Sequence, residues 1–361
     1  MIRVGLLNHP GRYGYEEEWL SRLAAAEVVS IRSEVGTAQL PSRILKVRHG
    51  RGLNRLGSSG HRAKYYGLGE LLADVDVLLT LELYSTTTAQ AIALAGRNDV
   101  AVVPIVYEII DNHPIYHLPP FRRNTRLAIE RASTVVCVTM SAARHVETLG
   151  VPRERVAVIS PGVDTERFKP HSEEGPLSVA FVGRLADHKG VLTLVESFQE
   201  VWAEMPSVRL VLIGEGPLGD TLRAVAATEA RLVLKGEVAR HAVAEELSAA
   251  ALFALPAQDT TRLGRLIGAE QYGFSLVEAL SAGLPVVTTS CGAIRDVVPK
   301  WNTFVPQRDP HSLAQGILQL LRAPEHRRRL GQLNREYAVA ELSQSLQARK
   351  LEALLEAVWK A

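Results

Sequence analysis

The sequence has few cysteines, few aromatic residues and no large excess of either charge. Its two cysteines, Cys137 and Cys291, lie far apart and belong to no Cys-x-x-Cys or Cys/His cluster, so we expect neither a disulfide nor a zinc site. Aromatic residues make up 6% of the chain, which gives no sign of stacking platforms for bases. Lys and Arg number 41 against 39 Asp and Glu, so we expect no nucleic-acid partner.

The chain also shows no segment that would take it into or through a membrane. No apolar run reaches the 18 residues that predict a membrane-spanning helix. The opening residues, Met-Ile-Arg-Val-Gly-Leu-Leu, are typical of a first strand and lack the long apolar core of a signal peptide. We therefore expect a cytoplasmic protein.

One segment departs from the balanced charge. Residues 43–64 contain seven Lys or Arg and two His but no Asp or Glu, with apolar residues interleaved. A stretch of this kind can lie against anionic lipid headgroups, which would place the protein peripherally at the inner face of the membrane. Its four glycines weaken a helix, and a solvated loop is the alternative interpretation.

Apolar runs of strand length alternate with longer helical patterns along the whole chain. Continuous Val, Ile and Leu runs are typical of strands buried on both faces. Strands that alternate with helices predict an α/β fold with doubly wound parallel sheets. The expected strands are residues 3–7, 75–80, 101–106, 134–138 and 156–159 and, in a second series, 178–182, 209–213, 232–235, 252–255 and 285–288.

A polar segment separates the two series of strands. Residues 169–176 are punctuated by Pro and Gly, and a fresh strand begins directly after them. We therefore expect two Rossmann-like domains, 1–170 and 171–361, facing a cleft. The tail, roughly 347–359, predicts an amphipathic helix that could close the second domain or pack back on the first.

The first motif with chemical content follows the strand at 178–182. Gly183 ends this strand, Arg184 and Lys189 stand five residues apart, and a helical pattern restarts near Gly190. Arg can hold two phosphate oxygens, Lys adds a point charge, and the helix N-terminus adds partial positive charge. The motif fits a diphosphate, although a surface loop with two solvated cations has the same spacing.

The second motif combines two carboxylates with a tight turn. Glu270 precedes the turn at Gly273, and Glu278 falls about one turn into the helix that follows. Two carboxylates would then lie at different depths of one pocket, with free helix amides between them. Carboxylates accept hydrogen bonds from sugar hydroxyls, and the amides can hold phosphate. Two glutamates eight residues apart also occur by chance.

The order of these motifs resembles the retaining GT-B glycosyltransferases of family 4. The Gly-Arg-(x)4-Lys-Gly turn comes first, then the glutamate pair, then Gly-Leu-Pro-Val-Val. Similar family patterns occur at residues 161–168, 214–217, 234–238 and 291–298. Together these matches cover about 160–310. The resemblance implies an N-terminal domain that binds the acceptor and a C-terminal domain that binds a nucleotide-sugar donor.

The resemblance also implies a role for individual residues in donor binding. Arg184 and Lys189 look like the pair that grips the diphosphate, and Glu270 looks like the ligand of the donor sugar. Glu278 looks like the ribose ligand, and Val238 would hold the base through its backbone. The whole implied donor-binding set is Gly183, Arg184, Lys189, Gly214, Gly216, Val238, Glu270, Gly273, Phe274, Ser275, Leu276 and Glu278.

The implied activity is that of a hexosyltransferase-type enzyme (EC 2.4) which retains the anomeric configuration. Members of the family work without a bound metal, and the nucleoside-diphosphate sugar is a substrate, so we expect no separate cofactor. The catalytic residues would be Glu270, Arg184 and Lys189. The expected partners are the nucleotide-sugar donor and a sugar or lipid-linked acceptor, such as a cell-envelope glycan, with a membrane contact through 43–64.

The first half of the chain matches the family less well. The loop after the first strand, residues 8–16, only loosely resembles the family's Gly-Gly loop. Many members have a His near the transferred sugar, after the strand that corresponds to 101–106. Here Glu108 stands close to that place and His113 follows five residues later. Either could serve the acceptor, and a plain loop residue is the alternative for His113.

Two further segments admit other interpretations. Residues 257–269 are longer than the resemblance implies and could form a lid carrying Arg262 and Arg265, or a solvated loop. Residues 214–219 satisfy Gly-x-Gly-x-x-Gly, but this dinucleotide fingerprint belongs to the first strand of a domain, so a redox enzyme is disfavoured. A non-catalytic or hydrolytic nucleotide-sugar-binding protein of the same fold, or an epimerase, remains the alternative to a transferase.

Overall fold

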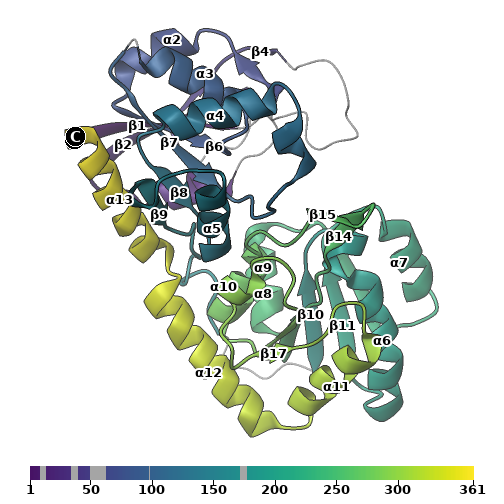
Figure 1. The fold of residues 1–361 in the computed structure, drawn as a ribbon. Helices are drawn as coiled ribbons and strands as arrows, with labels where there is room; N and C mark the ends of the chain where they lie inside the picture. Colours follow the sequence, from purple (N-terminus) through teal and green to yellow (C-terminus); the bar gives the residue numbers. More distant parts are fainter. Residues whose placement is uncertain (9–13, 34–39, 49–61, 97, 171–176) are drawn as a thin grey trace. The chain divides into compact units, whose positions relative to one another are not determined.

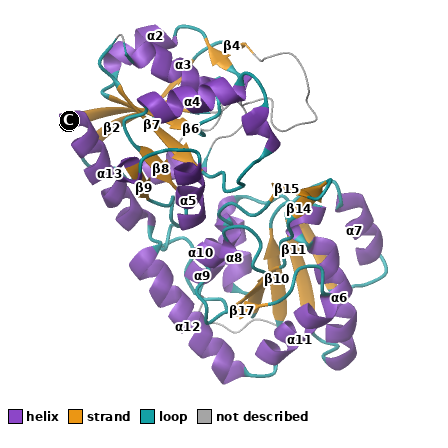
Figure 2. Cartoon of the chain, in the orientation of Figure 1, coloured by secondary structure: helices purple, strands orange, loops and turns teal. Residues whose placement is uncertain are grey.

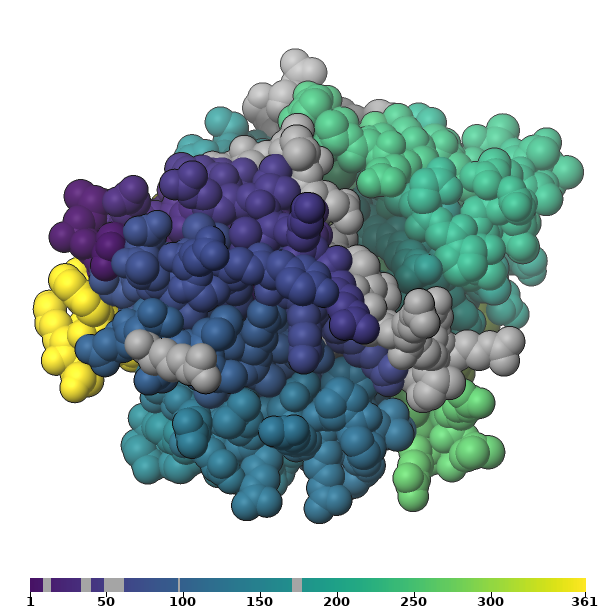
Figure 3. All heavy atoms as spheres, turned by 90° about the horizontal axis from the view of Figure 1, so that it is seen from above, coloured from purple at the N-terminus to yellow at the C-terminus, as the bar shows by residue number. Residues whose placement is uncertain are grey.

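The computed structural model describes the chain except for residues 9–13, 34–39, 49–61, 97 and 171–176. It divides into two compact units, unit 1 with Met1–Pro161 and Gln344–Ala361, and unit 2 with Gly162–Ser343 (Figure 1). In each unit, helices pack around a parallel sheet (Figure 2). In the space-filling view of Figure 3, unit 1 runs from purple to blue with the yellow C-terminus, and unit 2 from teal to green.

Unit 1 is built on a seven-stranded parallel sheet in the order β3-β2-β1-β6-β7-β8-β9. The order reverses between β1 and β6, which is the topological switch point of a doubly wound sheet. The strands are β1 (Ile2–Leu7), β2 (Ala26–Arg32), β3 (Ser42–Ile44), β6 (Val77–Leu81), β7 (Ala101–Val106), β8 (Val135–Cys137) and β9 (Val156–Val158). Every residue of β6 is buried, which agrees with the continuous apolar run that predicted a strand here.

The last helix of the chain belongs to unit 1. It is α13 (Gln344–Lys360), and it packs against α1 and β6. The expected tail helix at 347–359 is therefore present, and it packs back on the first domain. The other helices of unit 1 are α1 (Tyr15–Leu20), α2 (Leu68–Leu71), η2 (Leu72–Asp74), α3 (Thr86–Ala95), η3 (Pro114–His117), α4 (Phe121–Arg131), α5 (Met140–Thr148) and η4 (Arg153–Arg155).

Unit 2 repeats the architecture with six parallel strands in the order β12-β11-β10-β13-β16-β17. Its switch point lies between β10 and β13. The strands are β10 (Ser178–Val182), β11 (Arg209–Ile213), β12 (Leu232–Gly236), β13 (Leu252–Leu255), β16 (Val286–Thr288) and β17 (Thr303–Phe304). The helices are η5 (Asp187–Lys189), α6 (Val191–Glu204), α7 (Gly219–Ala226), α8 (Arg240–Ser248), α9 (Phe274–Ser281), α10 (Ile294–Val297), α11 (Pro310–Leu321) and α12 (Pro324–Glu341).

The sequence predicted the central strands and missed the interrupted ones. The expected strands at 101–106, 178–182, 209–213 and 252–255 agree with β7, β10, β11 and β13 to the residue. The strand β2 was missed because Glu27, Ser30 and Arg32 interrupt its apolar run. Two antiparallel pairs were also missed, β4 (Val47–Arg48) with β5 (Lys64–Tyr65), and β14 (Thr260–Arg262) with β15 (Arg265–Gly268).

The described part of the chain contains no helix that is both long and apolar enough to cross a bilayer. The two sheets with their crossover helices confirm the predicted fold class of two Rossmann-like, doubly wound units.

Two of the polar residues that interrupt β2, Ser30 and Arg32, belong to a buried network beneath α1, whereas Glu27 is exposed. The Arg32 Nε atom lies 3.1 Å from the Glu17 carboxylate, and both side chains are almost fully buried, at 3% and 1% exposure. Asn8 donates to the same carboxylate oxygen at 3.2 Å and to the Ser30 hydroxyl at 2.9 Å. The network therefore ties the ends of β1 and β2 to α1.

Replacing Arg32 by Met should lower the free energy of unfolding by about 3–5 kcal/mol, because the Glu17 charge would stay buried without its cation. The double variant Glu17→Gln, Arg32→Met should be markedly more stable than the single one, since no charge is then stranded. Urea unfolding followed by circular dichroism measures both. Arg126→Met, which breaks an exposed pair with Glu130, is the matched control and should change little. Equal stability of the single and double variants would contradict the charge argument.

Candidate functional site

Two loops of unit 2 come into direct backbone contact at the switch point. Residues 183–190 follow β10, and the segment that begins at Pro256 follows β13. Gly190 has a φ of +69°, and a Cβ added to it would lie 1.8 Å from the Pro256 carbonyl oxygen. Only glycine satisfies both conditions. The Gly-Arg-(x)4-Lys-Gly motif therefore lies at the carboxyl end of the sheet, where such folds bind their ligands.

The glycines at 214 and 216 support the same loop from the neighbouring strand. A Cβ on Gly214 would lie 2.1 Å from the Gly183 carbonyl oxygen, and one on Gly216 would lie 2.4 Å from that of Leu185. The Leu185 amide donates to the Glu215 carbonyl at 2.9 Å. Close packing on the 183–185 loop thus accounts for this Gly-x-Gly pattern. The expected donor contacts of Gly183, Gly214 and Gly216 stay predictions.

Lys189 and Glu270, 81 residues apart in the sequence, form an ion pair. The side chains are 21% and 10% exposed, so the pair is accessible but largely shielded from water. Glu270 is braced by Gly292, whose added Cβ would lie 2.2 Å from the Glu270 carbonyl oxygen. The Ala293 amide donates to that oxygen at 2.8 Å. The structure therefore brings together the cation that was predicted to bind the diphosphate of a donor and the carboxylate that was predicted to bind its sugar.

The exposure of Arg184 and the pKa of His188 describe the electrostatic surroundings of this ion pair. Arg184 is exposed, and no ion pair involves it among the described residues. Burial lowers the pKa of His188, and the charges of Lys189 and Arg184 lower it further, whereas Glu270 acts in the opposite direction. Asp187, in the same loop, also acts in the opposite direction. Arg184 and Lys189 outnumber Asp187 within residues 183–190, so the loop by itself carries a small net positive charge, which suits an anionic ligand.

The N-terminus of α9 lies directly after Glu270. Gly273 precedes the helix with a φ of +77°, and the Leu276 amide donates to its carbonyl at 2.9 Å. An α-helix leaves its first amides without an intrahelical partner, so those of Phe274 and Ser275 are suited to an anion. The Leu276 side chain is fully buried, which leaves only its backbone for the predicted contact.

Glu278, the expected ribose ligand, has a partner that the sequence did not predict. Arg240 Nη2 lies 2.7 Å from the Glu278 carboxylate, whose side chain is 4% exposed. Arg240 opens α8, two residues after Val238. No spacing in the sequence connects these two residues, because the strands between them set their distance. The predicted contact of Glu278 with the ribose and that of Val238 with the base stay predictions.

The inserted segment 257–269 contains a β-hairpin formed by β14 and β15. Leu263 and Gly264 form its turn, with φ values of +51° and +73°. A loop was expected here, but Arg262 and Arg265 lie in the two strands that flank the turn, and both are exposed. Whether the hairpin acts as a lid stays a prediction. At its base, the Cys291 thiol lies 3.2 Å from Asp259 Oδ1.

Both cysteines are buried and free, as the sequence predicted. Burial raises the pKa of Cys291 to about 12 and raises that of Cys137 as well, so both thiols stay protonated. Among the described residues, no group of three or more His, Cys, Asp or Glu is arranged to hold a metal ion.

In unit 1, the two residues proposed for the acceptor make local hydrogen bonds. His113 Nδ1 accepts from the Ile115 amide at 3.2 Å and caps η3. Glu108 Oε1 accepts from the amides of Ile109 and Ile110, at 2.9 and 2.8 Å. The acceptor roles of both residues stay predictions. The loosely matching loop 8–16 lies largely outside the described residues.

A buried polar group near the ends of β6 and β7 was missed by the sequence. His145 lies on α5, and its ring nitrogens are 2.9 Å from Asp111 Oδ1 and 2.9 Å from the Tyr116 hydroxyl. Burial raises the pKa of Tyr116 well above its usual value, and the charges of Glu82 and Glu108 add to this effect.

Glu82 is part of the same region. It is buried with a φ of +62°, a conformation that is costly for a non-glycine residue, and accepts from the Tyr107 amide at 3.0 Å. Glu82 directly follows the buried strand β6, and this position is the sequence feature that could have predicted a polar site here.

Comparisons with known proteins agree with this arrangement. A family model described as "Glycosyl transferases group 1" matches residues 162–337, and one described as "Glycosyltransferase Family 4" matches 20–167. The chain is 30% identical over 210 residues to a GDP-mannose-dependent monoacylated alpha-(1-6)-phosphatidylinositol monomannoside mannosyltransferase of Corynebacterium glutamicum. This match covers 54% of each chain, so our chain spans about half the length of that relative.

A second relative and a solved structure cover more of the chain. The GDP-mannose-dependent alpha-(1-6)-phosphatidylinositol monomannoside mannosyltransferase of Mycobacterium tuberculosis is 27% identical, over 72% of this chain and 71% of its own. The structure of Anabaena Alr3699/HepE in complex with UDP and glucose superposes with a TM-score of 0.76 at 16% identity, and covers 99% of this chain and 100% of that chain. The chain therefore belongs to the family 4 glycosyltransferases and has their GT-B fold.

Proposed function

We propose that the chain is a retaining, metal-independent glycosyltransferase that moves a hexosyl group from a nucleoside-diphosphate sugar to an acceptor. The observation that carries the proposal is the Lys189–Glu270 ion pair, which lies beside the N-terminus of α9. A diphosphate needs cations and amide donors, and the sugar joined to it needs a carboxylate to accept its hydroxyls. All three kinds of group occur here within one pair of loops.

The ion pair suggests how the donor is taken up. Without a ligand, Lys189 and Glu270 neutralise each other, which offsets the cost of their partial burial. When a diphosphate binds, its oxygens replace the carboxylate as the partner of Lys189. Glu270 is then released to accept hydrogen bonds from the sugar hydroxyls. Each charge therefore keeps a partner before and after binding.

The same groups account for catalysis of bond cleavage. As the bond between the anomeric carbon and the phosphate oxygen breaks, negative charge builds on the leaving phosphate. We propose that Lys189, Arg184 and the amides at the N-terminus of α9 stabilise that charge. In the front-face route that we propose, the acceptor hydroxyl bonds to the anomeric carbon, and its proton passes to the departing phosphate oxygen. The configuration is then retained without a covalent intermediate. Because cations already occupy the place of a magnesium ion, we propose that no metal is required.

The acceptor side of the proposal follows from two relatives and from the basic stretch 43–64. The relatives from Corynebacterium and Mycobacterium are named as mannosyltransferases acting on phosphatidylinositol mannosides. We propose by analogy a sugar or lipid-linked acceptor, bound by unit 1, and a peripheral contact with the membrane through 43–64. In the described part of that stretch, Arg43, Lys46, Arg48, Arg62 and Lys64 supply positive charge, and Ile44 is 50% exposed. Arg51 and Arg55 lie outside the described residues.

Replacing Glu270 by Gln should reduce sugar transfer by about 100-fold or more, because the sugar loses its acceptor, and should not weaken nucleoside-diphosphate binding, because Lys189 then has no carboxylate to give up. Transfer is measured with a panel of UDP-, GDP- and ADP-sugars, and affinity by thermal shift. Glu200→Gln, on the exposed face of α6, is the matched control and should leave both unchanged. Loss of nucleotide binding together with transfer would remove the sugar-binding role.

Replacing Arg184 by Gln should weaken nucleoside-diphosphate binding by about ten-fold, since a charge-assisted hydrogen bond to phosphate is lost, and should lower turnover as well. A nucleotide at about 100 times its dissociation constant stabilises the wild-type chain by about 2.7 kcal/mol, so the shift is readily detected. Arg329→Gln, exposed on α12, is the control cation. Kinetics that match the wild type would place Arg184 outside the site.

Changing Arg48, Arg51 and Arg55 together to Gln should reduce flotation with vesicles that contain anionic lipid, because the attraction to the headgroups is weakened. Vesicles of phosphatidylcholine alone are the control and should float little of either protein. If flotation on anionic vesicles is the same for both proteins, the stretch is a solvated loop.

A further inference from the structure

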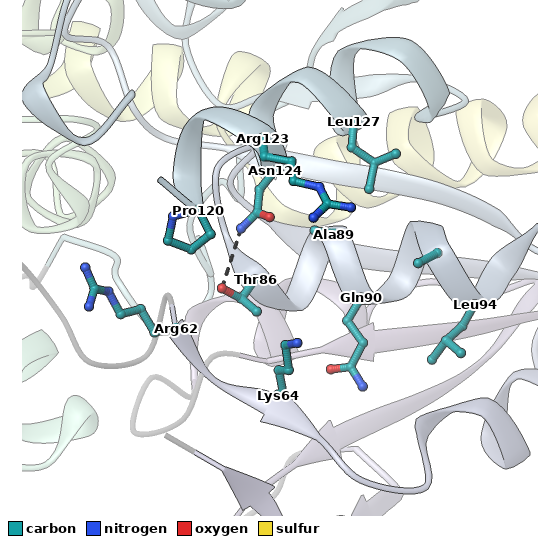
Figure 4. A pocket seen from close by; sticks show the side chains of 11 residues that line it. Arg62, Lys64, Thr86, Ala89, Gln90, Leu94, Pro120, Arg123, Asn124 and Leu127 are labelled. Atoms are coloured by element: carbon teal, nitrogen blue, oxygen red, sulfur yellow. Dashed lines mark hydrogen bonds between the residues drawn. The ribbon is translucent and has the colours of Figure 1, made fainter. Parts of the chain in front are cut away.

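Unit 1 contains a pocket of about 630 Å³ that is lined mainly by residues of α3 and α4 (Figure 4). One face of α3 lines it through residues spaced by three or four positions, and one face of α4 does the same. Lys64 of β5 and Arg62, which precedes that strand, add two cations. The lining residues are Thr86, Ala89, Gln90, Ala93 and Leu94 from α3, Pro120, Arg123, Asn124 and Leu127 at α4, and Arg62 and Lys64 beside β5.

The charged residues of the described lining are all cations. They are Arg62, Lys64 and Arg123, and no acidic residue lines the pocket among those that the structure describes. Figure 4 shows Lys64 and Arg123 on opposite sides of Ala89 and Gln90 of α3. No ion pair involves either of these two residues among the residues that the structure describes. In a chain with a net charge of only +2, Lys64 and Arg123 are therefore a local excess of positive charge.

Specific contacts hold the polar rim in place. The Gln90 amide bonds to both backbone atoms of Tyr65, accepting from its N–H at 2.8 Å and donating to its carbonyl at 2.6 Å. These two bonds fix β5, and with it Lys64, against α3. The guanidinium carbon of Arg62 lies 5.1 Å from the centre of the Phe121 ring. Asn124 donates to the Tyr84 carbonyl at 3.1 Å and lies 3.5 Å from the Thr86 hydroxyl, which joins α4 to α3.

The rest of the lining is small and apolar. Ala89 and Ala93 leave a groove along α3, and Leu94, Pro120 and Leu127 border it. Ala93 is exposed and Leu94 is partly exposed, so the groove is open to solvent. An apolar groove beside a cationic rim matches a ligand with an anionic head and an apolar tail.

We propose that this pocket binds a phosphorylated amphiphile, with its phosphate between Lys64 and Arg123 and its apolar part along Ala89, Ala93 and Leu127. A phosphate monoester carries about 1.5 to 2 negative charges, which balances the cations better than a single carboxylate does. The pocket lies within unit 1 and uses no residue of the donor site. Only the identity of the ligand as the acceptor rests on the proposed function, whereas its binding is measured without any donor.

Titration calorimetry on the full chain tests the site with three probes. Dihexanoyl phosphatidic acid, used below its micelle concentration, has both the phosphate and the tails. Inorganic phosphate lacks the tails, and dihexanoylglycerol lacks the phosphate. We expect phosphatidic acid to bind at least about ten-fold more tightly than either fragment, because only it fills the rim and the groove together. Inorganic phosphate that binds as tightly as phosphatidic acid would overturn the proposal.

Three variants locate the binding. Lys64→Gln combined with Arg123→Gln should weaken phosphatidic acid binding by about ten-fold or more, and Ala93→Trp should do the same by filling the groove. Arg122→Gln is the matched control, since Arg122 is exposed on α4 but does not line the pocket. Circular dichroism checks the fold of each variant.

The outcomes separate the site from its alternatives. An equal loss in Arg122→Gln would show long-range attraction rather than a site, and unchanged binding in Ala93→Trp would remove the groove. If phosphatidic acid fails to bind but sugar transfer is intact, this inference fails and the proposed function stands. If binding follows the expected pattern but no sugar is transferred from any donor, the proposed function fails and this inference stands.

Discussion

The donor site depends on loops whose backbones touch each other directly. Gly190 lies against Pro256, Gly214 against Gly183, and Gly292 against Glu270, each closer than any Cβ would allow. These contacts cannot adjust gradually, because a side chain at any of the three glycines would force a whole loop to move. The positions of Arg184, Lys189 and Glu270 therefore follow from the packing of backbone on backbone. The site is preformed by the sheet and its loops.

Within these packed loops, two carboxylates are each neutralised by a cation. Lys189 neutralises Glu270, and Arg240 neutralises Glu278, so both carboxylates that could meet a donor are paired before it arrives. Arg184 remains exposed and supplies the surplus positive charge. A ligand that is anionic at one end and rich in hydroxyls at the other can exchange these pairs without stranding a charge. This exchange links the packing of the loops to the chemistry that we propose.

Unit 1 has the same architecture but a different polar content. Near its switch point lie the buried carboxylates of Glu82 and Glu108, together with the Tyr116 hydroxyl and the His145 ring. His145 is 1% exposed, so it can position Tyr116 but cannot itself touch a ligand. The cationic pocket at α3 and α4 is a separate feature, whose charges face outward. Unit 1 thus combines a buried polar group with an open pocket lined by cations, and both features are compatible with the acceptor-binding role that we propose for it.

The sequence by itself determined which segments form the buried strands and where the motifs of the proposed donor site lie. Strands buried on both faces need continuous apolar runs, and turns that need glycine must contain it, so β7, β10 and Gly190 were visible in the sequence. Only the tertiary structure decided which distant residues meet. The pairing of Arg240 with Glu278 and the contact of His145 with Tyr116 depend on strand register and helix packing, and so does the placement of Lys64 and Arg123 around one pocket. Those distances are set by contacts between elements far apart in the chain, and no local spacing records them.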